Sequence, residues 1–485
     1  MQVSYYGGKY SIHRALALNE LVTTISLERA LLICAATPLP MVALVFGLWI
    51  RTAVMVGIST HAIVVQMTYL IDNFTVPMSQ MLQLVPSAVV GLAMLVAEYL
   101  VFPIPFFVLL VMPVFFILLT ISLRVILGAR GMRHILSHRK QLLQCIRFIC
   151  SQASTIVIFP AYEMFFGASQ GTKYQLVAIL LLPVIKVVAK NVVLHFAKDL
   201  EDMVLVEVIF TADFFNAVYV ATCMQNATST TAIFAISITD LSQTIVMLYK
   251  LQRRTITFLW RLRKTLDNAV ESDDMLALIC LLCRNPTNFR KQSHAGIRKK
   301  SCLPHHISMA SKKLLDSLDD ILKDHVMRPT ILVESLETLL TTECLLITAY
   351  LEAFLPLFYC CYLLVMTQLP NAKFHTEMTG VNRENVVATI LPLLIFGLLQ
   401  IVSFVLLVEV IRRNCGMRAL YQLAFVLTTQ RSLVLCKMLL WMVITLSFRV
   451  IHFGKSDRLR LLDVGVDFKF EYIRRGFPRL WTPLG

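Results

Sequence analysis

Eleven apolar runs, each near the length that crosses a lipid bilayer, constrain this sequence more than any other feature. A membrane-spanning helix needs about 20 consecutive, mostly apolar residues. The last run is the weakest of the eleven, because it is short and contains Lys437. The pattern predicts an all-α integral membrane protein built as a bundle of 10–11 transmembrane helices. The runs cover residues 30–50, 53–71, 81–101, 103–123, 145–166, 174–192, 203–222, 231–249, 345–366, 386–408 and 432–448.

The composition excludes other classes of protein. Of the 485 residues, 57% are hydrophobic and 15% are charged, whereas soluble proteins carry about 25% charged residues. An ordinary soluble enzyme of this length would need more charge to cover its domains. Disorder is excluded as well, because 29 Phe and 14 Tyr would make the chain collapse. Most of the 12 cysteines lie in or beside apolar or basic segments, so no disulfide framework is predicted.

Lys and Arg cluster after the even-numbered runs, and this asymmetry predicts an orientation. Positive residues are held on the cytoplasmic side of a membrane, so we expect a multi-pass protein with a cytoplasmic N-terminus. The net charge of +15 then indicates contact of the cytoplasmic face with anionic lipid of the bilayer, and no nucleic-acid partner is expected. The basic tail breaks this rule if 432–448 crosses, so that run either crosses or is re-entrant or interfacial. The clusters that set the orientation include Arg124, Arg130, Arg133, Arg139, Lys140, Arg147, Lys250, Arg253, Arg254, Arg412, Arg413 and Arg418.

The runs divide the chain into five parts. We expect a cytoplasmic N-terminal segment at 1–29, a membrane domain of about eight spans at 30–249, and a second membrane part of two or three spans at 337–448. Between the membrane parts, residues 250–336 form an insert with 16 Lys and Arg against 9 Asp and Glu. Apolar residues at helical spacing predict a helical cytoplasmic insert that packs under the bundle or along the bilayer. Residues 449–485 form the basic C-terminal tail.

A series of short motifs resembles a large family of uncharacterised multi-spanning transmembrane proteins of oomycetes such as Phytophthora. The resemblance runs from about Trp49 to about Glu471 and rests on the order and spacing of the motifs. It implies an integral membrane protein and no established activity, so no residue role follows from it. The motifs are Leu182-Pro-Val-Ile-Lys186, Lys190-Asn-Val-Val, Asp199-Leu-Glu-Asp202, Asp213-Phe-Phe-Asn-Ala-Val-Tyr219, Cys223-Met-Gln-Asn226, Tyr362-Leu-Leu-Val-Met-Thr-Gln-Leu-Pro-Asn371, Leu420-Tyr-Gln-Leu-Ala-Phe-Val-Leu427 and His452-Phe-Gly454.

Charged residues inside the apolar runs are the candidates for function, because each costs roughly 2.5–3.5 kcal/mol at the centre of a membrane helix. Lys186 and Glu207 lie at similar depths in consecutive runs, and we predict that they form an ion pair. Lys190 is one turn from Lys186 and near enough to the surface to reach the headgroups. Glu352 lies about two turns inside the ninth run and is a weaker candidate.

Asp213 and Asp240 lie at the centres of consecutive runs, at the same expected depth. Two carboxylates that approach each other in a low dielectric share a proton or bind a cation, which suits proton-coupled transport. The alternative is structural: each aspartate is protonated or hydrogen-bonded and holds helices together. The sequence leaves both interpretations open.

Two further motifs suggest sites outside the spans. Cys280 and Cys283, followed by Cys302 and His305, have the spacing of a zinc site, but the first two also fit an apolar helix as small buried side chains. Asn226 begins an Asn-x-Thr sequon on the predicted outer side and is a candidate for glycosylation.

No common enzyme signature occurs in the sequence. An enzyme is therefore not favoured, and no cofactor is expected. The leading hypothesis is a transporter or channel-like protein that uses the charged residues inside its spans. The alternative is a membrane receptor or scaffold whose basic insert binds proteins or anionic lipid.

Overall fold

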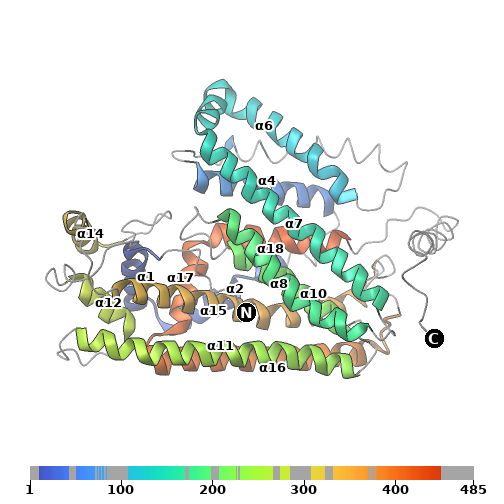
Figure 1. The fold of residues 1–485 in the computed structure, drawn as a ribbon. Coiled ribbons are helices and arrows are strands. Elements are labelled where there is room, and N and C mark those ends of the chain that lie inside the picture. The colour runs from blue at the N-terminus through green and yellow to red at the C-terminus, as the bar shows by residue number, and fades with distance from the viewer. Residues whose placement is uncertain are drawn as a thin grey trace, which may run out of the picture.

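The described part of the chain is almost entirely α-helical (Figure 1). The computed structural model describes residues 10–42, 51–71, 107–169, 174–197, 207–225, 230–265, 274–284, 307–322, 331–369 and 380–448, with several single positions between these ranges. The helices are α1 (Ile12–Thr24), α2 (Leu27–Ala36), α4 (Arg51–Leu70), α6 (Phe107–Ser137), α7 (Arg139–Ser169), α8 (Gln175–Ala197), the π-helix η2 (Ile209–Asp213), α10 (Phe214–Gln225), α11 (Thr230–Thr265), α12 (Met275–Arg284), α14 (Met309–Leu322), α15 (Ile331–Met366), α16 (Val386–Cys415), α17 (Ala419–Thr429) and α18 (Arg431–Phe448).

Among the described residues, six helices are long and apolar enough to cross a membrane, and up to eight segments qualify if each of two bent helix pairs counts as one span. This confirms the prediction of an all-α, multi-pass membrane bundle. The predicted run 81–101 lies outside the described residues except for Leu84, and the runs 30–50, 103–123 and 203–222 lie partly outside them. The six helices are α6, α7, α8, α11, α15 and α16, and the bent pairs join α1 to α2 and α17 to α18.

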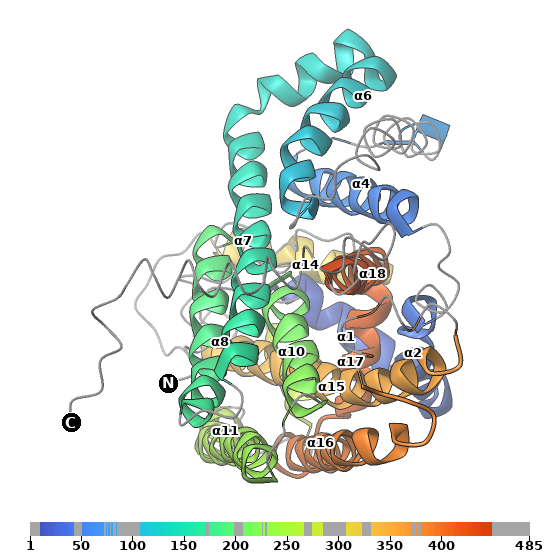
Figure 2. The same cartoon turned by 90° about the vertical axis from the view of Figure 1, so that its right-hand side faces the viewer.

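Helix α15 lies at the centre of the bundle, and α16 packs along it. Gly397 of α16 permits their close approach, since a Cβ there would lie 2.9 Å from the Leu357 side chain. Helix α11 runs beside α16 (Figure 1). Figure 2 views α11 and α16 nearly end-on, with α10 above them and with α4 and α6 at the opposite side of the molecule.

The N-terminal helix α1 is part of the core, although the sequence places it before the first span. Ile12, Leu16 and Leu18 are all buried, and α1 contacts α12 and α14 of the insert as well as α17. Ser11 caps the helix by accepting a hydrogen bond from the Arg14 amide. The described insert helices α12 and α14 therefore pack against the N-terminal helix.

The weakest predicted span, 432–448, is the second half of a bent pair. Helices α17 and α18 meet at an angle of 82°, and Lys437 is completely buried in α18. This geometry fits a broken span or a re-entrant segment. A re-entrant segment is one of the alternatives predicted for 432–448. The basic tail 449–485 lies outside the described residues.

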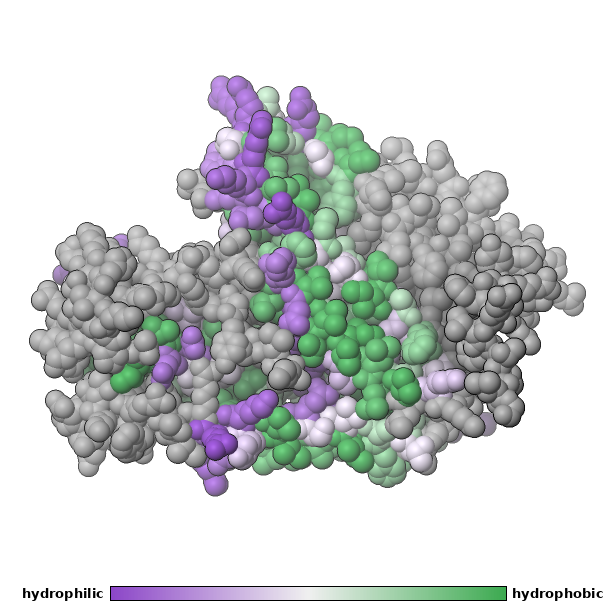
Figure 3. Space-filling view, in the orientation of Figure 1, coloured by the Kyte–Doolittle hydropathy of each residue, from purple (hydrophilic) through white to green (hydrophobic). Residues whose placement is uncertain are grey.

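The outward faces of the long helices are apolar. In α8, α11 and α16, exposed residues include Val184, Val188, Phe234, Ile238, Ile395 and Val402. Figure 3 shows apolar side chains gathered over the middle of the bundle and hydrophilic ones at the upper end, where α6 and α7 meet. Apolar surface of this extent belongs in hydrocarbon rather than water.

Candidate transport site

A π-helix positions Asp213, a completely buried aspartate. The five residues of η2 interrupt the helical register directly before α10, and Asp213 is its last residue. Single π-turns are rare and occur often at functional sites. Asp213 is fully buried, and the Thr348 hydroxyl on α15 donates to its Oδ2 at 2.8 Å.

Two lysines of α8 face this carboxylate from one helical turn apart. Lys190 Nζ lies 2.7 Å from Asp213 Oδ1, and Lys186 Nζ lies 3.6 Å from the same atom. The predicted reach of Lys190 to the membrane surface is therefore wrong, because a buried carboxylate holds its ammonium group. Pro183 lies three residues before Lys186 and removes the helical hydrogen bond to the Ile179 carbonyl.

The main partner of Lys186 is Glu352 on α15. Lys186 Nζ lies 2.6 Å from Glu352 Oε1, and both side chains are largely buried. Pro356 follows Glu352 by one turn, so the backbone carbonyl of Glu352 has no helical donor. Two proline-interrupted helices, α8 and α15, thus meet at this ion pair. Transporters place such interrupted helices around their binding sites.

Asp240 on α11 completes the cluster. It accepts a hydrogen bond from the Gln400 side chain on α16, and it lines the same cavity as Lys186. The structure thus brings together Lys186, Asp213, Asp240 and Glu352 around one region, as the hypothesis of a shared intramembrane site requires. These four residues and Lys190 make up a group of five that is called the central cluster below.

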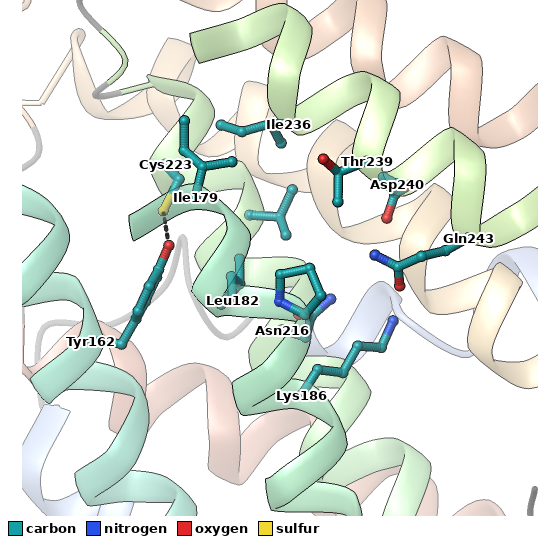
Figure 4. Close-up of a pocket in the computed structure, with 12 residues that line it drawn as sticks. Tyr162, Ile179, Leu182, Lys186, Asn216, Cys223, Ile236, Thr239, Asp240 and Gln243 are labelled. Atoms are coloured by element: carbon teal, nitrogen blue, oxygen red, sulfur yellow. Dashed lines mark hydrogen bonds between the residues drawn. The ribbon is translucent and has the colours of Figure 1, made fainter. Parts of the chain in front are cut away.

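A small cavity opens beside the central cluster (Figure 4). Its volume is about 30 Å³, which is room for one or two water molecules. Figure 4 shows the Lys186 side chain extending from α8 toward Gln243 and Asp240 on α11. At the far end the Cys223 thiol lies 3.8 Å from the Tyr162 hydroxyl. The polar lining also includes Asn216 and Thr239.

The charges of the central cluster do not balance. It contains two ammonium groups, on Lys186 and Lys190, and three carboxyl groups, on Asp213, Asp240 and Glu352. An unbalanced charge buried in a low dielectric costs several kcal/mol. Counted over these described residues, neutrality requires one additional proton or one bound monovalent cation.

Glu207 does not pair with Lys186, and the predicted ion pair between them is wrong. Glu207 Oε2 lies 2.9 Å from Lys437 Nζ on α18, and neither side chain is exposed. Gln152 on α7 bridges the pair, since its amide donates to Glu207 at 2.8 Å and its carbonyl accepts from Lys437 at 2.5 Å. Gln66 on α4 donates to the same carbonyl at 3.3 Å. These four residues are called the Lys437 network.

A third buried pair joins the N-terminal helix to α15, and the sequence analysis missed it. Arg14 donates to Glu343, and both side chains are at most 1% exposed. The Arg14 guanidinium also lies 5.2 Å from the centre of the Tyr10 ring. Glu343 falls just before the predicted run 345–366, whereas α15 begins at Ile331. Apolar residues at helical spacing before residue 345 could have shown that the helix begins earlier and includes Glu343.

The zinc and glycosylation candidates are only partly within the described residues. Cys280 and Cys283 are buried on α12, where burial raises the pKa of the Cys280 thiol to about 12. Both act there as small apolar side chains, while Cys302, His305 and Asn226 lie outside the described residues. Within the described ranges, no three His, Cys, Asp or Glu side chains are placed to hold a metal ion.

Comparison with known proteins adds no relative to this picture. No family model, no curated protein and no solved structure matches the chain. The resemblance to the oomycete family therefore stays a prediction, and any function has to be argued from the geometry of the site.

Proposed function

We propose that this multi-pass membrane protein is a transporter or channel-like protein in which the central cluster carries a proton across the middle of the bundle. The observation that supports this most strongly is the charge imbalance: three carboxyl groups and two ammonium groups meet beside a cavity of about 30 Å³. Ionisable groups inside a membrane that face a polar cavity typically mark an ion or proton pathway.

The arrangement supplies a simple exchange of partners. Lys186 pairs with Glu352 at 2.6 Å, and its ammonium group also faces the cavity that Asp240 lines (Figure 4). When Asp240 holds the additional proton, Lys186 remains with Glu352. When Asp240 releases the proton, its carboxylate attracts Lys186, and Glu352 becomes the group to be protonated. Each transfer preserves the net charge of the cluster.

The size of the cavity favours a proton over a larger cargo. A space for one or two waters can relay a proton between neighbouring polar groups, but it cannot hold an organic solute. Asn216, Gln243 and Thr239 line the cavity and offer the hydrogen-bonding groups that hold such waters. Transport of a second solute would require a different conformation of α8 or α11.

Proton flux into proteoliposomes tests the proposal. The purified full chain is reconstituted with a pH-sensitive dye inside, and a potassium diffusion potential drives protons inward. We expect Asp240→Asn to reduce the flux at least about tenfold, since the variant cannot exchange a proton at that position. Glu409→Gln is the matched control, because Glu409 pairs with Arg412 and Arg413 at the exposed end of α16. Its flux should equal that of the unchanged protein.

The opposite outcome favours the alternative functions. If the unchanged protein shows no proton flux above empty liposomes, the central cluster is structural. The receptor or scaffold hypothesis then takes precedence, with the basic insert 250–336 as its binding part. Under that hypothesis Asp240→Asn should change the amount of folded protein and nothing else.

A further inference from the structure

The connection between α6 and α7 forms a strongly basic elbow at the end of the bundle. Its six cationic side chains, all exposed, are Arg124, Arg130, Arg133, Arg139, Lys140 and Arg147. No Asp or Glu occurs in the sequence from Phe107 to Tyr162. Within the part of the chain that the structure describes, no carboxylate pairs with any of the six. The described residues therefore do not neutralise the positive charge of the elbow.

A break in α6 gives the elbow its shape. Gly128 has φ 66° and ψ −176°, a conformation that is essentially restricted to glycine. The break turns the following segment away from the first half of α6, and Figure 2 shows it crossing between α6 and α7. Arg130 and Arg133 lie on this crossing segment, and Arg139 and Lys140 begin α7. The cations thus gather along a segment that lies across the ends of two membrane helices.

Exposed apolar side chains alternate with the cations. Val125, Leu136, Leu143 and Ile146 are each between 47% and 75% exposed. A surface that combines unpaired cations with exposed apolar residues is typical of protein segments at the boundary between headgroups and acyl chains. A soluble polyanion would satisfy the cations but leave the apolar residues in water.

We propose that the α6–α7 elbow is a binding site for the headgroups of anionic phospholipids. The phosphate groups lie against Arg130, Arg133, Arg139 and Lys140, and the acyl chains cover Leu136 and Leu143. The sequence predicted contact of the basic face with anionic lipid in general, and this proposal names the residues that would bind it. It is independent of the proposed proton transport, because none of these residues belongs to the central cluster.

Lipid binding to the purified full chain tests the proposal. The protein in neutral detergent is titrated with dioctanoyl phosphatidylserine, with dioctanoyl phosphatidylcholine and with inorganic phosphate. We expect phosphatidylserine to bind and the other two probes to bind at least about tenfold more weakly. Each cation near an anionic lipid contributes about fivefold in affinity, so the double variant Arg130→Gln, Arg133→Gln should lose about 25-fold.

The matched control removes the same number of charges at another helix end. Arg412 and Arg413 are exposed but already paired with Glu409, so Arg412→Gln, Arg413→Gln should change the affinity less than about twofold. Equal losses in both double variants would show a diffuse attraction and overturn the site. Tight binding of inorganic phosphate alone would assign the cations to a free anion and overturn the lipid proposal. If the elbow variant does not fold, the salt dependence of lipid binding to the unchanged protein replaces it. A lipid affinity that does not fall with added salt would also overturn the lipid proposal.

Discussion

The two ends of the π-helix η2 hold carboxylates in opposite settings. Near its start, Glu207 meets one lysine, Lys437, and two glutamines complete the Lys437 network. At its end, Asp213 meets two lysines, Lys186 and Lys190, and Lys186 also pairs with Glu352 and lines the same cavity as Asp240. The first network has one positive and one negative charge, whereas the central cluster has two and three.

Under the proposed function, this difference separates a pair that joins helices from a site that carries a proton. A balanced pair joins helices from distant parts of the chain, and adding a proton to it or removing one would leave a buried charge uncompensated. An unbalanced cluster beside a cavity has at least two arrangements of similar energy, because the additional proton can reside on more than one carboxyl group. The comparison predicts that damage to the first region appears as lost stability and damage to the second as lost flux.

The largest loss of stability is expected from Lys437→Met. The variant leaves Glu207 buried without its cation, which costs about 3–5 kcal/mol, and most of the protein should fail to fold. The yield of monodisperse protein and its unfolding temperature measure this. Lys312→Met, at an exposed position of α14, is the control and should behave like the unchanged protein.

A second variant sharpens that result. Replacing both partners, as in Glu207→Leu with Lys437→Met, removes the uncompensated charge and should recover most of the lost stability. If the double variant is no more stable than Lys437→Met alone, the pair has a role beyond joining helices, and the contrast with the central cluster disappears.

Asp240→Asn should show the opposite pattern. Gln400 donates to Asp240, and an asparagine side-chain oxygen can accept the same hydrogen bond. The unfolding free energy should therefore change by less than about 1 kcal/mol, while proton flux is lost. A loss of stability as large as that of Lys437→Met would place Asp240 in the structural class.

The sequence identified the residues of the central cluster but not their partners. A charge within an apolar run is visible in the sequence, and Lys186, Asp213, Asp240 and Glu352 were all found in this way. Pairing depends on the rotation of each helix, and depth along the chain does not determine rotation. The predicted pair of Lys186 with Glu207 is wrong because Glu207 faces Lys437 on α18 instead.

Lys437 and Arg14 show the same limit of sequence analysis, because their partners cannot be read from the sequence. Lys437 weakened the prediction of a span, yet it is the buried partner that Glu207 requires. Arg14 was assigned to a segment before the first span, although its partner Glu343 lies on the central helix. In both cases the compensating charge is more than 200 residues away in the sequence, so no local pattern shows it.

Outside the two buried networks, replacement of Glu20 should have an intermediate effect on stability. Its carboxylate accepts hydrogen bonds from the Ser308 amide and hydroxyl and from the Ser311 hydroxyl, at 2.5–3.1 Å, and so connects α1 to the start of α14. Glu20→Ala should weaken this contact by about 1–2 kcal/mol. Faster hydrogen exchange of the α14 amides would show it, with Glu28→Ala on the exposed face of α2 as the control. Unchanged exchange in α14 would mean that other contacts hold the insert.

The smallest effect is expected at Asp274, which precedes α12. Its Oδ1 accepts from the Leu276 amide at 2.9 Å, but burial raises the pKa of the carboxyl above its usual value. A raised carboxyl pKa means that ionisation destabilises the fold, and this penalty is present above the folded pKa and absent below the unfolded value of about 3.9. Asp274→Asn keeps the acceptor without the charge.

The variant should therefore stabilise α12 at pH 7 by about 0.5–1 kcal/mol, with no gain below pH 4. Hydrogen exchange of α12 amides at pH 7 and unfolding temperatures across this pH range measure the effect. A stability difference that does not depend on pH would contradict it, because the gain would then come from packing rather than from the lost charge. A gain confined to neutral pH would instead show that even the insert carries a partly buried charge that destabilises it, although by far less than the loss expected in the Lys437 network.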